Sequence, residues 1–460
     1  MSPNLPRRNR RFACCLIVLT LVVPSRADVI LDWSEITLDA IRADRTAPPR
    51  AGRALAMVHV AMFDAVNAVS QNFEPYLDVN VTVRAGTSRE AAAATAAHRV
   101  LVALFPAQSA GFDAALANTL GQIADGRSQD DGEALGIAIG DAMLAQRSDD
   151  GSGATVAYTV GTEPGDWQPT PPAFAEAALP QWPYVAPFCI PDITQVRRPG
   201  PPALTSAEFT TSFNEVKALG AANSASRTAD QTQIAFFWVD GPGTATPPGH
   251  WFQIARDVAN QRGTSLEENA RLFALLGLAE CDAGICAWDN KYAYDDWRPV
   301  TAIRAADTDG NPDTEPDPAW TPLIPTPPFP SYTSGHSTFS GAGGKILALF
   351  FGRDDLPFST SSDDVPGVTR SFNRFSEASN EAGRSRIYGG IHWEYDNQDG
   401  LSTGRELALY VFDNFLQPRA TDVIELDPND VLECGPIGLF PLGLLTMTLA
   451  AWRARPRRRA

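Results

Sequence analysis

The feature that most constrains the fold is the spacing of apolar residues, which repeat with the period of an α-helix along much of the chain. Within residues 49–69, for example, Leu55, Val58, Met62 and Val66 fall on one helical face. No stretch shows the sustained two-residue alternation that is typical of half-buried strands. The sequence therefore predicts an all-α helical bundle.

Helical periodicity and loop composition divide the chain into two regions. The predicted helices cover residues 49–69, 88–105, 107–124, 130–146, 227–238, 265–291, 344–351, 368–382 and 400–416, and Thr205-Ser-Ala-Glu is typical of a further helix start. Residues 148–205 and 311–330 are rich in proline with no periodicity, which indicates long loops. We expect an N-terminal helical region with a wrapping loop (28–205) and a second helical region (206–430).

The two ends of the chain have the composition of targeting segments. Residues 1–27 have an arginine cluster, the 12-residue apolar run 12–23 and a small residue before Asp28, which predicts an export signal. A twin-arginine signal is a weaker alternative. Residues 431–460 hold a mostly apolar stretch followed by arginines, which predicts a C-terminal sorting or anchor tail, the alternative being a terminal core helix. We therefore expect an exported protein, periplasmic or on the cell surface.

Charge and cysteine content limit the partners. The formal net charge is −17 although both ends are basic, so the body between them is strongly acidic and is not expected to bind nucleic acid. Cys281 and Cys286 could pair in an exported protein. Because five positions on one helix is awkward geometry for a disulfide, two buried thiols are favoured. His59 and His98 lie within apolar stripes and are expected to be packed or capping histidines.

Two stretches supply cations and a histidine. Lys291 and Arg298 are seven positions apart, which would place them two turns apart on one helical face. Arg386 precedes His392 by six positions, and Asp396 follows four later, a spacing that would put the last two on one helical face. Arginine offers a planar fork of donors suited to a tetrahedral oxyanion, and histidine can act as nucleophile, acid or metal ligand.

A third stretch adds uncharged donors and a second histidine. Ser334-Gly335-His336 enters a run of small residues and is expected to open a helix. A hydroxyl, a free backbone N–H and an imidazole would then lie at the positive end of the helix dipole. Together the three stretches predict a cage for a phosphate-like anion.

The order Lys-x6-Arg-Pro, Ser-Gly-His and Ser-Arg-x5-His-x3-Asp resembles the superfamily of vanadium-dependent haloperoxidases and type-2 phosphatidic acid phosphatases. Longer similarity, from Trp33 to Gln417, favours the haloperoxidase branch, and residues 238–253 resemble the segment that supports the site there. Thr333 departs from the motif, which usually has proline before Ser-Gly-His. We expect this change to alter loop stiffness more than the set of groups that contact the anion.

The resemblance implies a haloperoxidase-like fold of two packed helical bundles with long Pro/Gly-rich loops, and vanadate as cofactor with phosphate as a competing occupant. His392 would be the metal ligand and His336 the acid–base group, while Lys291 would also polarise bound peroxide. The groups implied to stabilise the anion's oxygens are Lys291, Arg298, Ser334, Gly335 and Arg386. Asp240 resembles the family's buried acid that pairs with the late arginine or the acid–base histidine, although a simple turn aspartate is nearly as compatible with the sequence.

The implied reaction uses hydrogen peroxide to oxidise halide to a hypohalous species that halogenates organic acceptors. In an exported acid phosphatase, the alternative, His392 would attack phosphorus and His336 would protonate the leaving alcohol. A non-catalytic oxyanion-binding envelope protein is the third hypothesis. Phe329 stands where fungal chloroperoxidases have phenylalanine and algal bromoperoxidases histidine, which suggests chloride, unless this ring only packs the loop.

Overall fold

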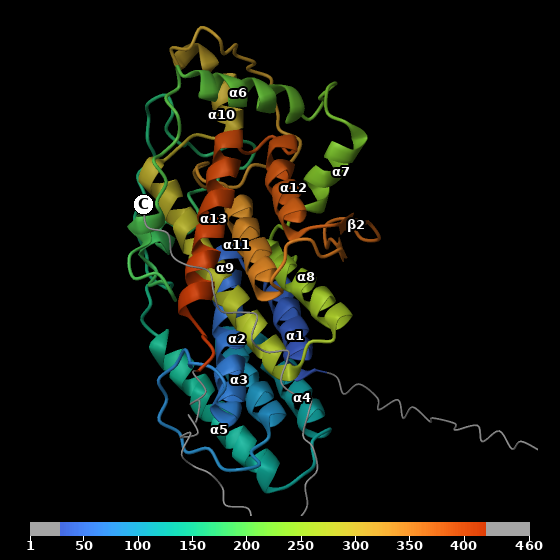
Figure 1. The fold of residues 1–460 in the computed structure, drawn as a ribbon. Helices are drawn as coiled ribbons and strands as arrows, with labels where there is room; N and C mark the ends of the chain where they lie inside the picture. Colours follow the sequence, from blue (N-terminus) through green and yellow to red (C-terminus); the bar gives the residue numbers. More distant parts are fainter. Residues whose placement is uncertain (1–27, 420–460) are drawn as a thin grey trace, which may run out of the picture. The chain divides into compact units, whose positions relative to one another are not determined.

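Helices make up nearly all the secondary structure in the computed structural model, which describes residues 28–419 of the 460-residue chain (Figure 1). The all-α prediction is confirmed for this part of the chain. The predicted signal segment, the predicted tail and Cys434 lie outside the described residues.

The helices follow one another in two long series. The first series contains α1 (Val29–Asp44), α2 (Pro48–Ser70), α3 (Arg89–Leu104), α4 (Ser109–Leu120) and α5 (Arg127–Gln146). The second series contains α6 (Ala207–Leu219), α7 (Ala229–Phe237), α8 (Thr246–Arg262), α9 (Leu266–Tyr294), α10 (Pro299–Arg304), α11 (Gly335–Phe350), α12 (Phe375–Tyr388) and α13 (Glu394–Asn414). Short 3-10 helices are η1 (Pro106–Gln108), η2 (Trp182–Tyr184), η3 (Ile193–Val196) and η4 (Ala306–Thr308).

Side-chain caps explain why several helices begin where the sequence predicts. Ser88 caps α3 and Ser206 caps α6, each accepting a hydrogen bond from a backbone N–H in the first turn. Ser265 and Glu268 form a reciprocal capping box that starts α9. Four of the otherwise unpaired N–H groups at these helix starts are satisfied in this way.

Helix α9 is the centre of the described structure. Nearly every residue from Asn269 to Lys291 is buried, because α2, α11 and α13 all pack against this helix. The backbones of α2 and α9 are close: a Cβ at Gly277 would lie 2.9 Å from the Cα of Ala56. Residues of both predicted regions therefore contribute to one large apolar core.

Polar residues of α9 hold the segment predicted as a wrapping loop, residues 148–205, whose helical elements are two short 3-10 turns. The buried carboxylate of Asp282 accepts hydrogen bonds from three consecutive backbone N–H groups, those of residues 188–190, at 2.7, 2.8 and 3.1 Å. Asp289 receives two hydrogen bonds from the guanidinium of Arg197, at 2.7 and 2.6 Å. A loop without regular structure thus gains fixed contacts along two turns of the central helix.

One predicted helix is wrong over its first part. Residues 368–382 contain strand β2 (Thr369–Phe372) before α12 begins at Phe375. Strand β1 (Phe358–Ser361) pairs with β2 in antiparallel register, with Phe358 opposite Phe372. Each strand has only four residues, too few for alternation to be visible in the sequence. This hairpin packs on α8.

The expectations for the isolated cysteines and histidines are confirmed. Cys281 and Cys286 are buried free thiols, as is Cys189. His59 is buried with Nδ1 2.8 Å from a backbone carbonyl of α2, and His98 lies 2.7 Å from a carboxylate oxygen of Asp113.

Within residues 28–419, no single helix has the length and apolar composition of a membrane span. One pair of helices, Arg89–Leu104 and Pro106–Leu120, has the length and composition only when taken together, and a bend of 119° separates its two parts.

A buried carboxyl in α9 generates a stability prediction. Glu280 is 0% exposed, neither carboxylate oxygen has a partner among the described residues, and a Cβ at Gly343 would lie 2.5 Å from Oε1. Burial raises the pKa of Glu280 well above its usual range. Protonation therefore favours the folded state, and stability is lost as pH rises through and beyond the unfolded pKa.

We expect Glu280→Met, which removes the carboxyl but keeps an unbranched side chain, to stabilise the protein at alkaline pH by on the order of 2 kcal/mol. The gain should shrink at acid pH, where the unfolded carboxyl is also protonated. Denaturant unfolding at several pH values measures this, with Glu163→Met, on an exposed loop, as control. A pH-independent difference between the Glu280 variant and wild type would contradict the argument.

Candidate functional site

The three predicted motifs converge where the ends of several helices meet. Lys291 lies in the last turn of α9, Arg298 is the residue before α10, Ser334 is the residue before α11, and Arg386 lies in the last turn of α12. A cavity of about 30 Å³ is lined by Gly335, His336, Arg386 and His392, with apolar side chains around it. Such a volume accommodates a few oxygen-sized groups.

The predicted helical geometry of two pairs is wrong, although each pair is near in space. Helix α9 ends at Tyr294 and Asp295 takes a left-handed conformation (φ 52°), so Lys291 and Arg298 do not share a helical face. His392 precedes the first residue of α13 by two positions, and only Asp396 is helical. The chain turns between the members of each pair, which residue spacing alone does not reveal.

His392 is fixed at both ring nitrogens. Nδ1 lies 2.7 Å from Oδ2 of Asp396, and Nε2 lies 3.0 Å from Nη1 of Arg298. A guanidinium can only donate, so Nε2 is the acceptor and the ring proton is on Nδ1. Burial, and then the charges of Arg298 and Lys291, lower the pKa of His392. The lone pair of Nε2 therefore points toward the cations and is free of a proton.

Asp396 orients His392 and is itself held by two further donors. Its Oδ2 accepts hydrogen bonds from Ser331 Oγ at 2.5 Å and from the backbone N–H of Trp393 at 3.2 Å. Burial raises the pKa of Asp396, while the hydrogen bond from Ser331 and the charge of Lys291 oppose that rise. The sequence motif includes Asp396, but no pattern identifies Ser331.

Lys291 anchors the loop that leads into α11. Its Nζ donates to three backbone carbonyls of residues 330–333, at 3.0, 2.9 and 2.6 Å, which uses all three ammonium protons. Burial and the neighbouring Arg298 lower the pKa of Lys291, and the carboxylates of Asp396 and Asp296 oppose this. In this structure, then, Lys291 positions the loop, and a direct contact with an anion would replace one of these bonds. Asp296 was not identified from the sequence.

The two arginines are buried with donors to spare. Arg298 donates to the carbonyls of Phe329 and Ile391 at 2.8 and 2.7 Å, yet Nη2 has no partner among the described residues. Arg386 donates through Nη1 to the carbonyl of Trp238 at 2.6 Å, and Nε has no partner within the same part of the chain. Burial lowers the pKa of Arg298 to about 9 and of Arg386 to about 10, so both are charged at neutral pH.

The Ser-Gly-His segment opens α11 as predicted. Ser334 Oγ accepts from the backbone N–H of Ser337 at 3.3 Å and lies 2.9 Å from its hydroxyl. Gly335 is the first helical residue, so its N–H has no intrahelical acceptor. His336 Nε2 lies 3.0 Å from the carbonyl of Val239, which fixes the proton on Nε2 and leaves Nδ1 as acceptor. Burial and the charge of Arg386 lower the pKa of His336 well below its usual value.

Asp240 has a different partner from the one that the resemblance implies. It lies in a left-handed turn (φ 47°) after α7, and this turn directs its carboxylate toward α8. There His250 Nδ1 lies 3.1 Å from Oδ1, and no ion pair joins Asp240 to Arg386 or His336 among the described residues. The backbone carbonyls of the two preceding residues hold Arg386 and His336 instead. His250 was missed because it is a lone histidine that belongs to no motif.

Phe329 both lines the cavity and packs the loop. Its ring centroid is 4.9 Å from that of Trp288, and the guanidinium carbon of Arg298 lies 4.9 Å from its centroid. The aromatic face offers Arg298 a cation–π contact in a place where water has little access.

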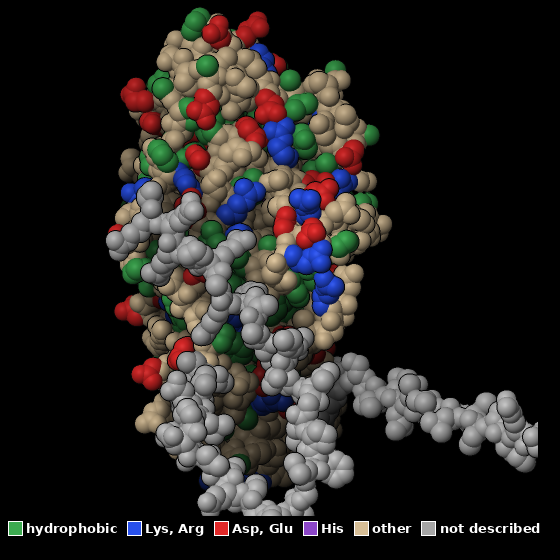
Figure 2. Space-filling model, viewed as in Figure 1, with side chains coloured by type: hydrophobic (Ala, Val, Ile, Leu, Met, Phe, Trp, Pro, Cys, Tyr) green, Lys and Arg blue, Asp and Glu red, His purple; other side chains and the backbone are tan. Residues whose placement is uncertain are grey.

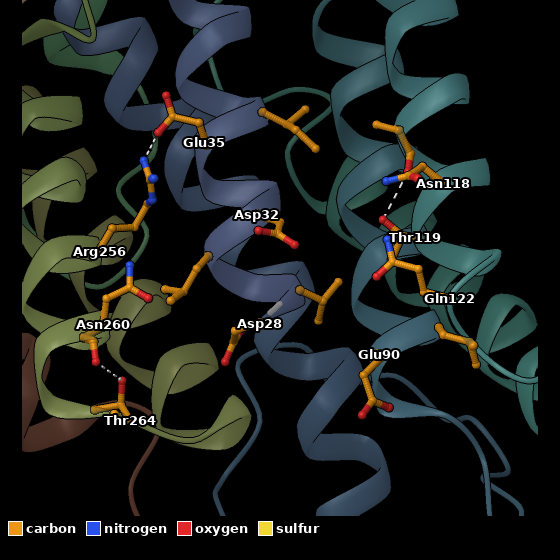
Figure 3. Close-up of a pocket in the computed structure, with 17 residues that line it drawn as sticks. Asp28, Asp32, Glu35, Glu90, Asn118, Thr119, Gln122, Arg256, Asn260 and Thr264 are labelled. Carbon is orange, nitrogen blue, oxygen red and sulfur yellow. Dashed lines mark hydrogen bonds and ion pairs between the residues drawn. The ribbon is translucent and has the colours of Figure 1, made fainter. Parts of the chain in front are cut away.

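A much larger cavity, of about 820 Å³, lies between α1, α4 and α8 (Figure 3). Asp28, Asp32 and Glu90 line it, and Glu35 and Arg256 point toward one another at one side, joined by an ion pair. Its carboxylates oppose binding of an anion, and none of the predicted site residues lies there. Size therefore does not identify the functional site in this protein.

Surface charge on the face drawn in Figure 2 is mixed. Lys and Arg side chains are interspersed with Asp and Glu and form no continuous basic surface on that face. The cationic groups that matter for the site are buried: Lys291 and Arg298 are 0% exposed, and Arg386 is 2% exposed.

Comparisons with known proteins agree with this geometry. The family model described as the VCPO second helical-bundle domain matches residues 271–420. Vanadium chloroperoxidase of Curvularia inaequalis is 28% identical over 536 aligned residues, which cover 90% of this chain and 87% of that protein. The crystal structure of the first bacterial vanadium-dependent iodoperoxidase is 29% identical, with a TM-score of 0.74, and covers 85% of this chain and 97% of its own.

Apo-type bacterial vanadium-dependent chloroperoxidase has the same fold, at 17% identity and a TM-score of 0.63, with 78% of this chain and 91% of its own covered. Fold, sequence relatives and the converging motifs point the same way. Over residues 271–420 in its family match, and over most of its length in sequence and fold, the chain is similar to vanadium-dependent haloperoxidases.

Proposed function

We propose that the protein is a vanadate-dependent haloperoxidase, which uses hydrogen peroxide to oxidise halide to a hypohalous species that halogenates organic acceptors. One observation carries the proposal: the unprotonated Nε2 of His392 lies beside two buried guanidinium groups that retain unpaired donors. A nitrogen ligand for a metal and donors for oxyanion oxygens are the two things that vanadate requires. The residues present therefore fit the cofactor.

Bound vanadate would supply a Lewis-acidic metal centre at which peroxide becomes reactive toward halide. Nη2 of Arg298 and Nε of Arg386 would donate to the oxyanion, joined by the Gly335 N–H and the Ser334 hydroxyl. Because these donors are fixed by the fold before the anion arrives, they need little rearrangement to stabilise its charge.

Asp396 makes His392 a better ligand. A carboxylate that accepts the Nδ1 proton fixes the tautomer and raises the basicity of Nε2. Ser331 and the backbone of Trp393 in turn hold the carboxylate, so the ring orientation is set by three linked contacts.

His336 is suited to accept the proton that hydrogen peroxide loses as it binds. Its Nδ1 is the unprotonated nitrogen and its lowered pKa keeps it neutral at neutral pH. A bound anion would counter the charge of Arg386 and so raise the pKa of His336 toward the range in which general bases work well.

The same cage could support phosphoryl transfer through His392, so the acid-phosphatase alternative needs a direct comparison of the two activities. The named relatives include both a chloroperoxidase and an iodoperoxidase. Assays of one preparation with chloride, bromide and iodide, and with a phosphomonoester, would separate these substrates. Phe329 at the cavity supports chloride as the halide in this proposal. We also propose export to the periplasm or cell surface, on the basis of the sequence of residues 1–27 and 431–460.

His392→Ala should abolish vanadate-dependent halogenation, because it removes the nitrogen assigned as the ligand of the metal. Halogenation of monochlorodimedone with increasing orthovanadate measures this effect. His98→Ala, which removes a histidine paired with Asp113 on other helices, is the matched control and should retain activity. Saturable vanadate-dependent turnover in His392→Ala would refute the ligand assignment.

His336→Ala should spare anion binding while turnover at saturating vanadate falls by about 10²–10⁴-fold, the usual contribution of an acid–base group. In the wild type, the rate of peroxide-dependent turnover should fall as pH falls and His336 becomes protonated. The residual rate of the variant should not show this decrease at acid pH. Vanadate occupancy and rate are measured in the same titration. Equal rates for variant and wild type would leave His336 as a helix-cap residue only.

Phosphate should inhibit reconstitution competitively, because it has the charge and tetrahedral shape of vanadate. Activity is followed while vanadate is added to vanadate-free protein at several phosphate concentrations. The vanadate concentration for half-activation should rise in proportion to phosphate, with an unchanged maximum. Curves that coincide at millimolar phosphate would show that the two anions do not share a site.

A further inference from the structure

His250, in α8, makes three side-chain contacts, with Trp238, Asp240 and Thr360. The residue is 1% exposed, and its ring stacks on Trp238 with centroids 4.5 Å apart. Nδ1 lies 3.1 Å from Oδ1 of Asp240, and Nε2 lies 3.1 Å from the hydroxyl of Thr360 on the β1 strand. A carboxylate can only accept, so Nδ1 donates and Asp240 is the group that this ring restrains.

Asp240 follows by two positions Trp238, whose backbone carbonyl accepts a hydrogen bond from Nη1 of Arg386 at 2.6 Å. The charge of Asp240 raises the pKa of Arg386, as does that of Asp364, whose Oδ2 accepts the backbone N–H of Asp240 at 2.8 Å. Yet no ion pair joins Asp240 and Arg386 among the described residues, and Nε of Arg386 has no partner there. The backbone two residues before Asp240 therefore contacts Arg386, whereas the carboxylate of Asp240 contacts His250.

An anion in the cage and the carboxylate of Asp240 would compete for the same donor. A carboxylate bonded to a guanidinium forms a charge-assisted pair that satisfies the donor and cancels its charge. An incoming oxyanion would then have to displace that carboxylate before it could use Arg386. Restraining the carboxylate elsewhere removes this cost.

We propose that His250 sets the anion affinity of the cage by holding Asp240 away from Arg386. The inference rests on the proposed function only in requiring that the cage binds a tetrahedral oxyanion. His250 is a positioning residue in this proposal, since it contacts neither the anion nor the reacting atoms. It acts through Asp240 on the number of donors that Arg386 can offer.

Calorimetric titration of inorganic phosphate into vanadate-free protein at neutral pH tests this without relying on turnover. His250→Phe keeps an aromatic ring against Trp238 but removes both hydrogen bonds, and it should weaken phosphate binding by about tenfold. The double variant His250→Phe/Asp240→Asn should recover wild-type affinity, because no charged competitor remains. Thr360→Val is the matched control: it removes the bond to Nε2 only and should stay within about twofold of wild type.

Unchanged affinity in His250→Phe, or a loss that Asp240→Asn does not reverse, would overturn the proposal. If His250→Phe does not fold, Asp240→Asn alone tests the proposal, because the asparagine side chain can still accept the hydrogen bond from Nδ1 of His250. Its phosphate affinity should equal or exceed that of wild type, and a fall would overturn the proposal. Wild-type protein that binds no phosphate would refute the cage itself, whereas equal binding by all variants would refute only the role of His250.

Discussion

The structure depends on burying three cations, Lys291, Arg298 and Arg386, in one place with few acceptors. Burying a charge is costly unless it is paired and hydrogen-bonded. Lys291 meets this cost with three carbonyls of the loop before α11 and with two nearby carboxylates. The arginines meet it only in part, because each retains a donor without a partner among the described residues. An oxyanion would complete both, so the arrangement is better explained by binding than by stability.

This electrostatic arrangement also explains the states of the two histidines. Neighbouring cations and burial keep both rings neutral, and the fixed partners decide which nitrogen is free. Asp396 accepts a hydrogen bond from Nδ1–H of His392, so Nε2 carries no proton and accepts from Arg298 in this structure. The Val239 carbonyl accepts from Nε2–H of His336, which leaves Nδ1 as the unprotonated nitrogen. The unprotonated nitrogens are thus opposite ones in the two rings, and both residues line the same cavity, as a ligand and a base working on one centre require.

Much of this could be predicted from the sequence because the motifs combine rare residue types in a fixed order. The helical period located most helices, and Ser334-Gly335-His336 opens α11 as predicted. Predictions that depended on backbone direction failed: Lys291 lies in α9 whereas Arg298 precedes α10, and the hairpin between α11 and α12 was predicted in part as helix. Short strands and left-handed turns such as Asp295 carry too few residues to leave a pattern.

Supporting residues were harder to predict for the same reason. Ser331, Asp296 and His250 each act through one or two contacts made by distant segments, and none has a motif. The resemblance implied that Asp240 pairs with Arg386 or His336. It could not show that the carboxylate of Asp240 is instead hydrogen-bonded to His250. Tertiary packing decides which polar side chains contact one another in a core. The pattern of a single sequence reveals packing only where the buried residues recur at a regular spacing.

The most direct test of the account is a crystal structure of the protein with bound orthovanadate. The account predicts one vanadium within bonding distance of His392 Nε2, with oxygens hydrogen-bonded to Nη2 of Arg298 and Nε of Arg386. The Nδ1 atom of His392 should remain bonded to Asp396. Vanadate bound elsewhere, or a cage in which both arginine donors are satisfied by protein groups and exclude the anion, would contradict the account.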